Sequence, residues 1–167
     1  MVQKYPPAAG IDEATATFVT SGVSINVASR DAQLRPSVAR CCGARVSADR
    51  AEIRVLLVRA QTAALLADVE ACGEVAAVFS NVDSHRTLQI KASGARVVDA
   101  DVDDIEAART YLRKFIASLD AIGHAPEFTE IFLGIDENDL VAVVMRPSAQ
   151  FVQTPGPGAG QRLGSAA

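Results

Sequence analysis

One predicted strand carries a row of polar side chains that could bind a ligand. In it, Leu88 and Ile90 alternate with Thr87, Gln89 and Lys91, so the apolar and polar residues point to opposite faces of the strand. The polar face offers hydroxyl, amide and ammonium groups, which suit a polar, anionic ligand. A sheet with one solvated face shows the same alternation by default, so both interpretations stay open for Gln89 and Lys91.

The cations of this acidic protein are gathered in one part of the chain. The net charge is −4, yet residues 30–96 hold ten Lys and Arg against seven Asp and Glu, and the rest of the chain has a balance of −7. Net acidity argues against a dedicated nucleic-acid binder, whereas a local excess of cations suggests a site for one anion. We therefore expect a small anionic ligand and no nucleic acid.

The remaining composition excludes further classes of protein. No apolar run is long enough to span a membrane, and the first residues lack the apolar core of a signal peptide. Three cysteines cannot all pair, and the adjacent Cys41 and Cys42 suit neither a disulfide nor a zinc site. The two histidines, His85 and His124, lie far apart in the chain. We expect a cytoplasmic protein with no membrane association and no metal site.

Hydrophobic periodicity divides the chain into strands and helices. Alternating or continuous apolar runs predict strands at residues 23–29, 37–47, 53–58, 75–79, 86–98, 140–144 and 151–152. Three- and four-residue spacing predicts helices at residues 12–22, 61–73, 101–123 and 128–133. Asp12 and Asp101 are the expected N-caps of two of these helices.

Two of the strands have special features. The run at 75–79 is apolar throughout, which predicts burial on both faces. The strand at 86–98 is long enough to need a bend, and Gly94 is the expected position of that bend.

The order of these elements predicts the fold class. Short connections between successive strands favour antiparallel pairing, and a sheet of this size tends to close on itself to hide its edges. We therefore expect a mainly β protein with flanking helices, an antiparallel β-barrel in one domain that spans residues 1–167. Residues 1–9 and 154–167 are expected to be irregular tails.

Three short motifs follow one another along the predicted barrel. Pro36 precedes a segment that begins with Arg40, ends with Arg45 and holds Cys41, Cys42, Gly43 and Ala44 between them. Val58-Arg59 ends the third strand, and Arg86-Thr87 opens the long strand. In order and spacing, this set resembles the pyridoxamine 5′-phosphate oxidase-like flavoproteins. The resemblance implies a split β-barrel that binds FMN between the two subunits of a homodimer.

The resemblance also implies roles for individual residues. The phosphate of FMN would be held by Arg59, Gln61 and Thr62, close to a helix N-terminus. The ring and the ribityl chain would be lined by Arg40, Cys41, Cys42, Arg45, Val58, Arg86, Thr87 and Gln89. The adjacent cysteines could form a redox pair beside the flavin, but a disulfide between neighbours is strained, so small buried hydrophobic residues are the favoured interpretation.

This chain departs from the oxidase members of the family at two places. Ala63-Ala64-Leu65 stands where they carry Ser-Arg-Lys, and the chain has no tryptophan. We therefore expect an FMN-dependent oxidoreductase whose substrate is a small molecule other than pyridoxamine phosphate. A nicotinamide or another small reductant would pass electrons to the flavin. No catalytic acid or base is identified, because the cofactor carries the chemistry of a flavin enzyme.

Two alternatives stay open. One is a non-catalytic carrier or sensor of the same fold that binds flavin or haem, and in the haem case His85 would matter. The other is a small barrel without a cofactor, whose polar strand face binds a protein partner.

Overall fold

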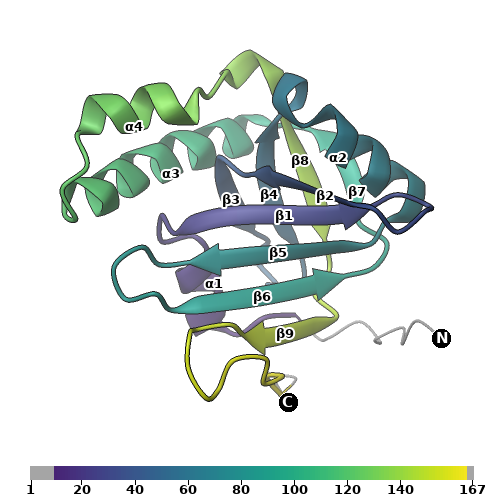
Figure 1. Ribbon diagram of the computed structural model, residues 1–167. Helices are drawn as coiled ribbons and strands as arrows, with labels where there is room; N and C mark the ends of the chain where they lie inside the picture. Colours follow the sequence, from purple (N-terminus) through teal and green to yellow (C-terminus); the bar gives the residue numbers. More distant parts are fainter. Residues whose placement is uncertain (1–9, 165–167) are drawn as a thin grey trace.

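Two antiparallel sheets form the centre of the computed structural model, which describes residues 10–164 (Figure 1). The five-stranded sheet has the order β2 (Pro36–Arg40), β1 (Ser24–Arg30), β5 (Val75–Ser80), β6 (Thr87–Ala92) and β9 (Ala149–Val152). The four-stranded sheet has the order β3 (Gly43–Val46), β4 (Ile53–Val58), β8 (Leu140–Met145) and β7 (Arg96–Asp99). The two sheets do not join into one closed ladder, so the predicted antiparallel split β-barrel is confirmed.

The helices lie around the barrel. They are α1 (Glu13–Val19), α2 (Arg59–Cys72), α3 (Val102–Asp120) and α4 (Pro126–Leu133), and one 3-10 turn, η1 (Glu137–Asp139), leads into β8. The predicted caps are present: Asp12 accepts a hydrogen bond from the N–H of Thr15, and Asp101 and Asp104 form a reciprocal capping box. No helix among residues 10–164 is long and apolar enough to cross a membrane.

The predicted strand at 37–47 is wrong in one respect, because it is two strands in different sheets. The N–H of Cys41 still donates to the carbonyl of Ile25 in β1 (2.9 Å), whereas the N–H of Cys42 donates to Leu56 in β4 (2.8 Å). The chain therefore changes sheet between two adjacent residues. Gly43 permits this corner, because a side chain there would press against Leu56 and α3.

The predicted strand at 86–98 is divided in the same way. It forms β6 in the five-stranded sheet and β7 in the four-stranded sheet, and Arg86 lies just before β6. Gly94, with φ +72°, lies in the connection, so the predicted bend is in place, but it carries the chain to another sheet. The N–H of Ala95 fixes this corner by donating to the carbonyl of Gly73 (2.9 Å).

Burial corrects one further prediction. In β5, Val75, Ala77 and Phe79 are buried and the residues between them are half-buried, so this strand has one covered face instead of two. The strand buried on both faces is β8, in which all six residues are buried. It lies between β4 and β7 in its sheet.

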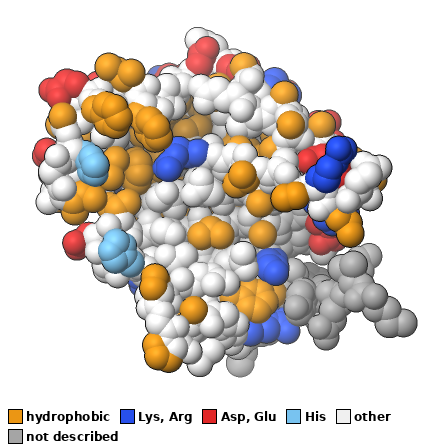
Figure 2. All heavy atoms as spheres, viewed as in Figure 1, with side chains coloured by type: hydrophobic (Ala, Val, Ile, Leu, Met, Phe, Trp, Pro, Cys, Tyr) orange, Lys and Arg blue, Asp and Glu red, His pale blue; other side chains and the backbone are white. Residues whose placement is uncertain are grey.

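Among residues 10–164, no helix covers the outer face of the five-stranded sheet (Figure 1). Cross-strand pairing puts Arg40, Asn26, Val78, Gln89 and Phe151 in one row across this face. In Figure 2 this face is broad and shallow, and hydrophobic side chains gather beside it over α3 and α4.

Candidate functional site

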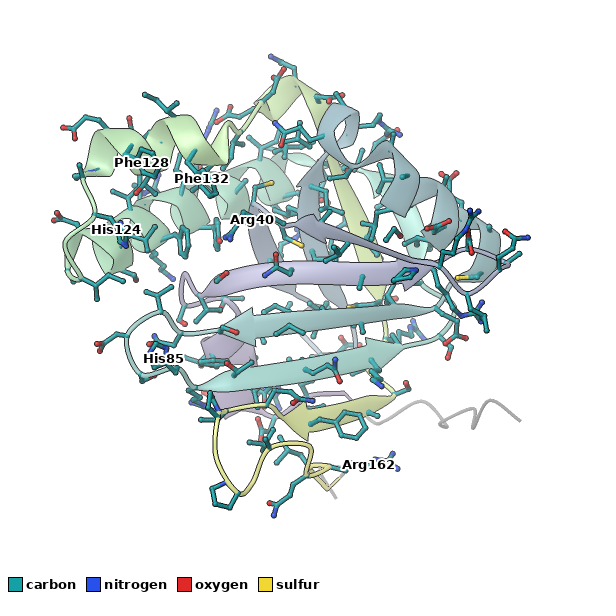
Figure 3. The ribbon with its side chains drawn as sticks, viewed as in Figure 1. Arg40, His85, His124, Phe128, Phe132 and Arg162 are labelled. Atoms are coloured by element: carbon teal, nitrogen blue, oxygen red, sulfur yellow. The ribbon has the colours of Figure 1, made fainter. Side chains whose placement is uncertain are left out.

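A hollow of about 240 Å³ lies where the start of β1 and the end of β2 meet α3 and α4. Its walls are mostly apolar and include three phenylalanines; the lining residues are Ser24, Arg40, Val82, Phe115, Leu119, His124, Phe128, Thr129 and Phe132. Figure 3 shows Arg40 below Phe132, with Phe128 farther along α4 and His124 in the connection between α3 and α4. The hollow therefore joins an aromatic wall to one cation.

Arg40 is available to a ligand. Its Nη1 donates to Ser24 Oγ at 3.3 Å, and its guanidinium carbon lies 5.6 Å from the centre of the Phe132 ring. Among the described residues it has no carboxylate partner, and it is exposed. A guanidinium in this setting can pair with an anion or lie on a flat aromatic ring.

The aromatic wall comes from a helix that the sequence did not identify as functional. Phe128 and Phe132 stack on each other with ring centres 6.0 Å apart, yet they are 64% and 59% exposed, and Ile131 between them is 82% exposed. Large apolar side chains this exposed mark a surface that contacts a ligand or a partner. The spacing of two phenylalanines on one helix face was the only signal for this wall in the sequence.

A larger hollow, of about 550 Å³, lies between α1, β3 and α3. Its cations are already engaged by the protein: Lys114 Nζ donates to the carbonyl of Thr20 (3.1 Å), and Arg50 Nε donates to that of Ile11 (3.2 Å). Asp103 and Glu106 also line it. Because its charges are mixed and satisfied, we favour the smaller hollow as the binding site.

Arg45, five residues from Arg40, contacts a different part of the molecule. It pairs with Asp101 (2.6 Å), Asp103 (2.9 Å) and Asp104 (3.0 Å) at the start of α3. Burial acts to raise the pKa of Asp101, but the N–H of Asp104 and the guanidinium of Arg45 outweigh it and hold that pKa below its ordinary value. Three carboxylates of the same chain therefore surround the guanidinium of Arg45.

The residues expected to hold phosphate lie together at the start of α2, and each already has a partner. Arg59 pairs with Asp99 (2.7 Å), and Gln61 Nε2 donates to the carbonyl of Gly134 (3.2 Å). The buried Thr62 donates its hydroxyl to the carbonyl of Val58 (2.9 Å), which belongs to the helix N-cap.

One backbone N–H group of the helix N-terminus is also engaged. The backbone N–H of Ala60 donates to Asp139 Oδ2 at 2.7 Å. Nothing in the local sequence around residue 60 announced this cap, because Asp139 comes from η1, far along the chain.

The residues expected on the ring side are spread over the open sheet. Arg86 lies on the ring of Phe18, 4.3 Å from its centre, and Thr87 Oγ1 lies 3.0 Å from Ser80 Oγ. Gln89 stands in the same row as Arg40, with Asn26 and Val78 between them. Within one chain, the structure therefore brings Gln89 and Arg40 onto the outer face of the five-stranded sheet. Arg45 and Arg59 lie elsewhere and pair with carboxylates of the chain itself.

The two adjacent cysteines are buried, as the hydrophobic interpretation predicted. Burial raises the pKa of Cys42 to about 12 and also raises the pKa of Cys41. Both thiols are therefore neutral at ordinary pH and poor nucleophiles. His85 is exposed in the turn between β5 and β6, and Figure 3 places it away from the Arg40 hollow.

Comparison with known proteins shows the fold but no close relative. No family model and no curated protein matches the sequence. Among solved structures, HupZ from Group A Streptococcus is 13% identical with a TM-score of 0.56, over 90% of this chain and all of that one. A putative pyridoxamine 5′-phosphate oxidase from Lactobacillus delbrueckii is 17% identical with a TM-score of 0.53, over 89% of this chain and 99% of that one.

An F420 reductase is a third similar structure, 17% identical with a TM-score of 0.50, over 84% of this chain and 98% of its own. The similarity in each case covers nearly the whole chain, whereas the identities are too low to carry a shared activity. The chain thus has the split β-barrel fold of the pyridoxamine 5′-phosphate oxidase-like proteins.

Proposed function

We propose that this protein binds a flavin of the FMN class in the Arg40 hollow and acts as an oxidoreductase on a small molecule. The observation that carries the proposal is the pairing of Arg40, which has no carboxylate partner in residues 10–164, with the aromatic wall of Phe128 and Phe132. The fold supports it, because similar structures include a putative pyridoxamine 5′-phosphate oxidase and an F420 reductase, whose names both denote redox enzymes.

The aromatic wall and the cation of the hollow support its use for the ring portion of such a cofactor. A tricyclic flavin is flat and largely apolar, and it carries polar atoms along one edge. Phe128 and Phe132 would hold its face, and the guanidinium of Arg40 would donate to its polar edge or balance its negative charge when reduced. A bound flavin supplies hydride transfer, while the protein binds the ring, orients it and limits its contact with water.

A second copy of the chain is the proposed partner that closes the hollow. Val38 in β2, two residues before Arg40 on the same strand face, is 70% exposed, and Ile131 in α4, next to Phe132 in the chain, is 82% exposed. An apolar surface of this kind, continuous with a flat sheet face, is typical of subunit interfaces.

Ligand titration tests the proposed function. FMN is added to the purified protein, and binding is followed by the quenching of flavin fluorescence. We expect saturable binding in the wild type and about tenfold weaker binding in Arg40→Gln, because a partly desolvated cation–π contact contributes roughly 1–2 kcal/mol. The matched control is Arg35→Gln, an exposed arginine in the β1–β2 turn that pairs only with Asp31 among the described residues.

The following outcomes separate the alternatives. Consumption of NADH or NADPH by the FMN-loaded protein supports an enzyme, and its absence supports a carrier. A saturable shift of the Soret band of hemin on addition of the protein, with no binding of FMN, would favour the haem-binding alternative. A protein that ignores both ligands, or an Arg40→Gln variant that binds FMN as well as the Arg35→Gln control, would contradict the proposal.

Sedimentation velocity tests the proposed dimer. We expect Ile131→Asp to shift the protein towards the monomer, because a charge at a buried interface costs desolvation energy. Val102→Asp is the matched control, since Val102 is 77% exposed at the start of α3. A wild-type protein that is monomeric at all accessible concentrations would refute this part of the proposal.

A further inference from the structure

The start of α2 would be a good phosphate site if it were open. Free N–H groups in the first turn of a helix bind anions, and a neighbouring arginine strengthens that binding. In this chain the anion is already present: the carboxylate of Asp139 accepts the N–H of Ala60 at 2.7 Å. The arginine is also engaged, because Arg59 pairs with Asp99 at 2.7 Å.

The local charge opposes a second anion. Arg59 contributes one positive charge, whereas Asp99 and Asp139 contribute two negative charges within hydrogen-bond distance of the same short segment. A phosphate monoester carries about −1.5 to −2 at neutral pH. It would have to displace both carboxylates and then lie beside them, at a distance where like charges repel strongly.

Distance from the ring site is not the obstacle. Helix α4 connects the two places, because Phe128 and Phe132 line the Arg40 hollow and Gly134, which caps the helix, accepts a hydrogen bond from Gln61 in α2. A ligand in the hollow therefore lies one helix away from the start of α2. The side-chain donors at the α2 end are engaged as well, because Thr62 Oγ1 donates to the carbonyl of Val58 and Gln61 Nε2 donates to that of Gly134.

We infer that this protein recognises the ring of its flavin and not the phosphate, because Asp139 and Asp99 fill the α2 anion site from within the chain. The inference rests on the proposed function and narrows it. It makes Asp139 a specificity-determining residue: its carboxylate removes the advantage that FMN would have over riboflavin, which has the same ring and no phosphate.

A comparison of the two flavins tests the inference in the wild-type protein. The dissociation constants of FMN and riboflavin are measured by fluorescence quenching at the same pH and ionic strength. We expect them to agree within about threefold. A preference for FMN of tenfold or more would overturn the inference alone, whichever subunit supplies the phosphate contact. A protein that binds neither flavin would overturn the proposed function, and the inference with it.

A pair of variants identifies the residue responsible. Asp139→Asn keeps a carbonyl oxygen that can accept the N–H of Ala60 but removes the negative charge, so we expect FMN to gain at least threefold over riboflavin. Glu70→Gln is the matched control, because it removes one charge from an exposed position of α2 outside the first turn. Riboflavin affinity should stay the same in both variants, which shows that the ring site is intact. An unchanged ratio of FMN to riboflavin affinity in Asp139→Asn would overturn the assignment.

Discussion

The substitution Asp104→Ala gives the sharpest test of how the two arginines under α3 are used. Asp104 is fully buried, and its carboxylate accepts bonds from Arg54 Nε (2.9 Å), from Arg54 Nη2 and from the N–H of Asp101 (3.1 Å). Arg45 Nε lies 3.0 Å away on the same carboxylate. Without this group, the nearest carboxylate to Arg54 is that of Asp101, at 3.7 Å.

The expected loss of stability follows from these contacts. Removing one partner of a buried ion pair costs about 3–5 kcal/mol, since the other charge is left without compensation. Arg45 keeps Asp101 and Asp103 and therefore moderates the effect, so we expect about 3 kcal/mol for Asp104→Ala. In a chain of this size, that loss lowers the melting temperature by roughly 6–12 °C.

Chemical denaturation followed by circular dichroism measures this loss. The matched control is Asp103→Ala, because Asp103 also pairs with Arg45 but is 74% exposed, and an exposed pair contributes about 1 kcal/mol or less. A loss below about 1 kcal/mol for Asp104→Ala, or one equal to that of the control, would refute the reasoning. It would then follow that Asp101 and Asp103 alone are enough to balance the charges of Arg45 and Arg54.

Three further predictions concern stability and reactivity. The pKa of Glu52 is held below its ordinary value of 4.5, chiefly by Arg146, and that of Asp101 is also lowered. A group with a lowered pKa stabilises the folded state at pH values above its unfolded pKa. The unfolding free energy should therefore be steady near neutral pH and fall as the pH drops below about 4. A rise in stability on acidification would contradict this. Because burial raises the pKa of Cys42 to about 12, iodoacetamide at mildly alkaline pH should leave Cys42 unmodified in the folded protein and label it after denaturation, as read by mass spectrometry; rapid labelling of the native protein would be inconsistent with its burial. Gly22→Ala should cost about 1–3 kcal/mol in urea denaturation, because its φ of +85° is left-handed and a Cβ would lie 2.4 Å from that of Lys114; a neutral effect would mean that the α1–β1 turn adjusts freely.

Local features of the fold could be predicted from the sequence because local interactions cause them. Asp12 and Asp101 cap their helices through N–H groups three residues away, and Gly73 ends α2 in a left-handed conformation beside its own turn. The alternation of Leu88 and Ile90 with polar residues likewise depends only on strand geometry.

Features that depend on distant partners could not be predicted. Alternation looks the same whether a strand continues or passes to a second sheet, so the corner at Cys41 and Cys42 was invisible in the sequence. The partners of Arg45 and Ala60 lie 56 and 79 residues away. The positions of Arg45 and Arg59 along the chain therefore indicated contacts with a cofactor. In the folded protein, both arginines pair with carboxylates of the same chain.

The place of β8 in the chain determines when the barrel can be completed. Its register runs from Ile53 opposite Met145 to Val58 opposite Leu140 on one side, and β7 pairs along its other side. During synthesis on the ribosome, β4 and β7 both emerge well before the strand that separates them, so each waits with an unpaired apolar edge. Pairing across so many residues is slow to form, and until β8 joins the sheet these unpaired edges can pair with other chains, which favours aggregation.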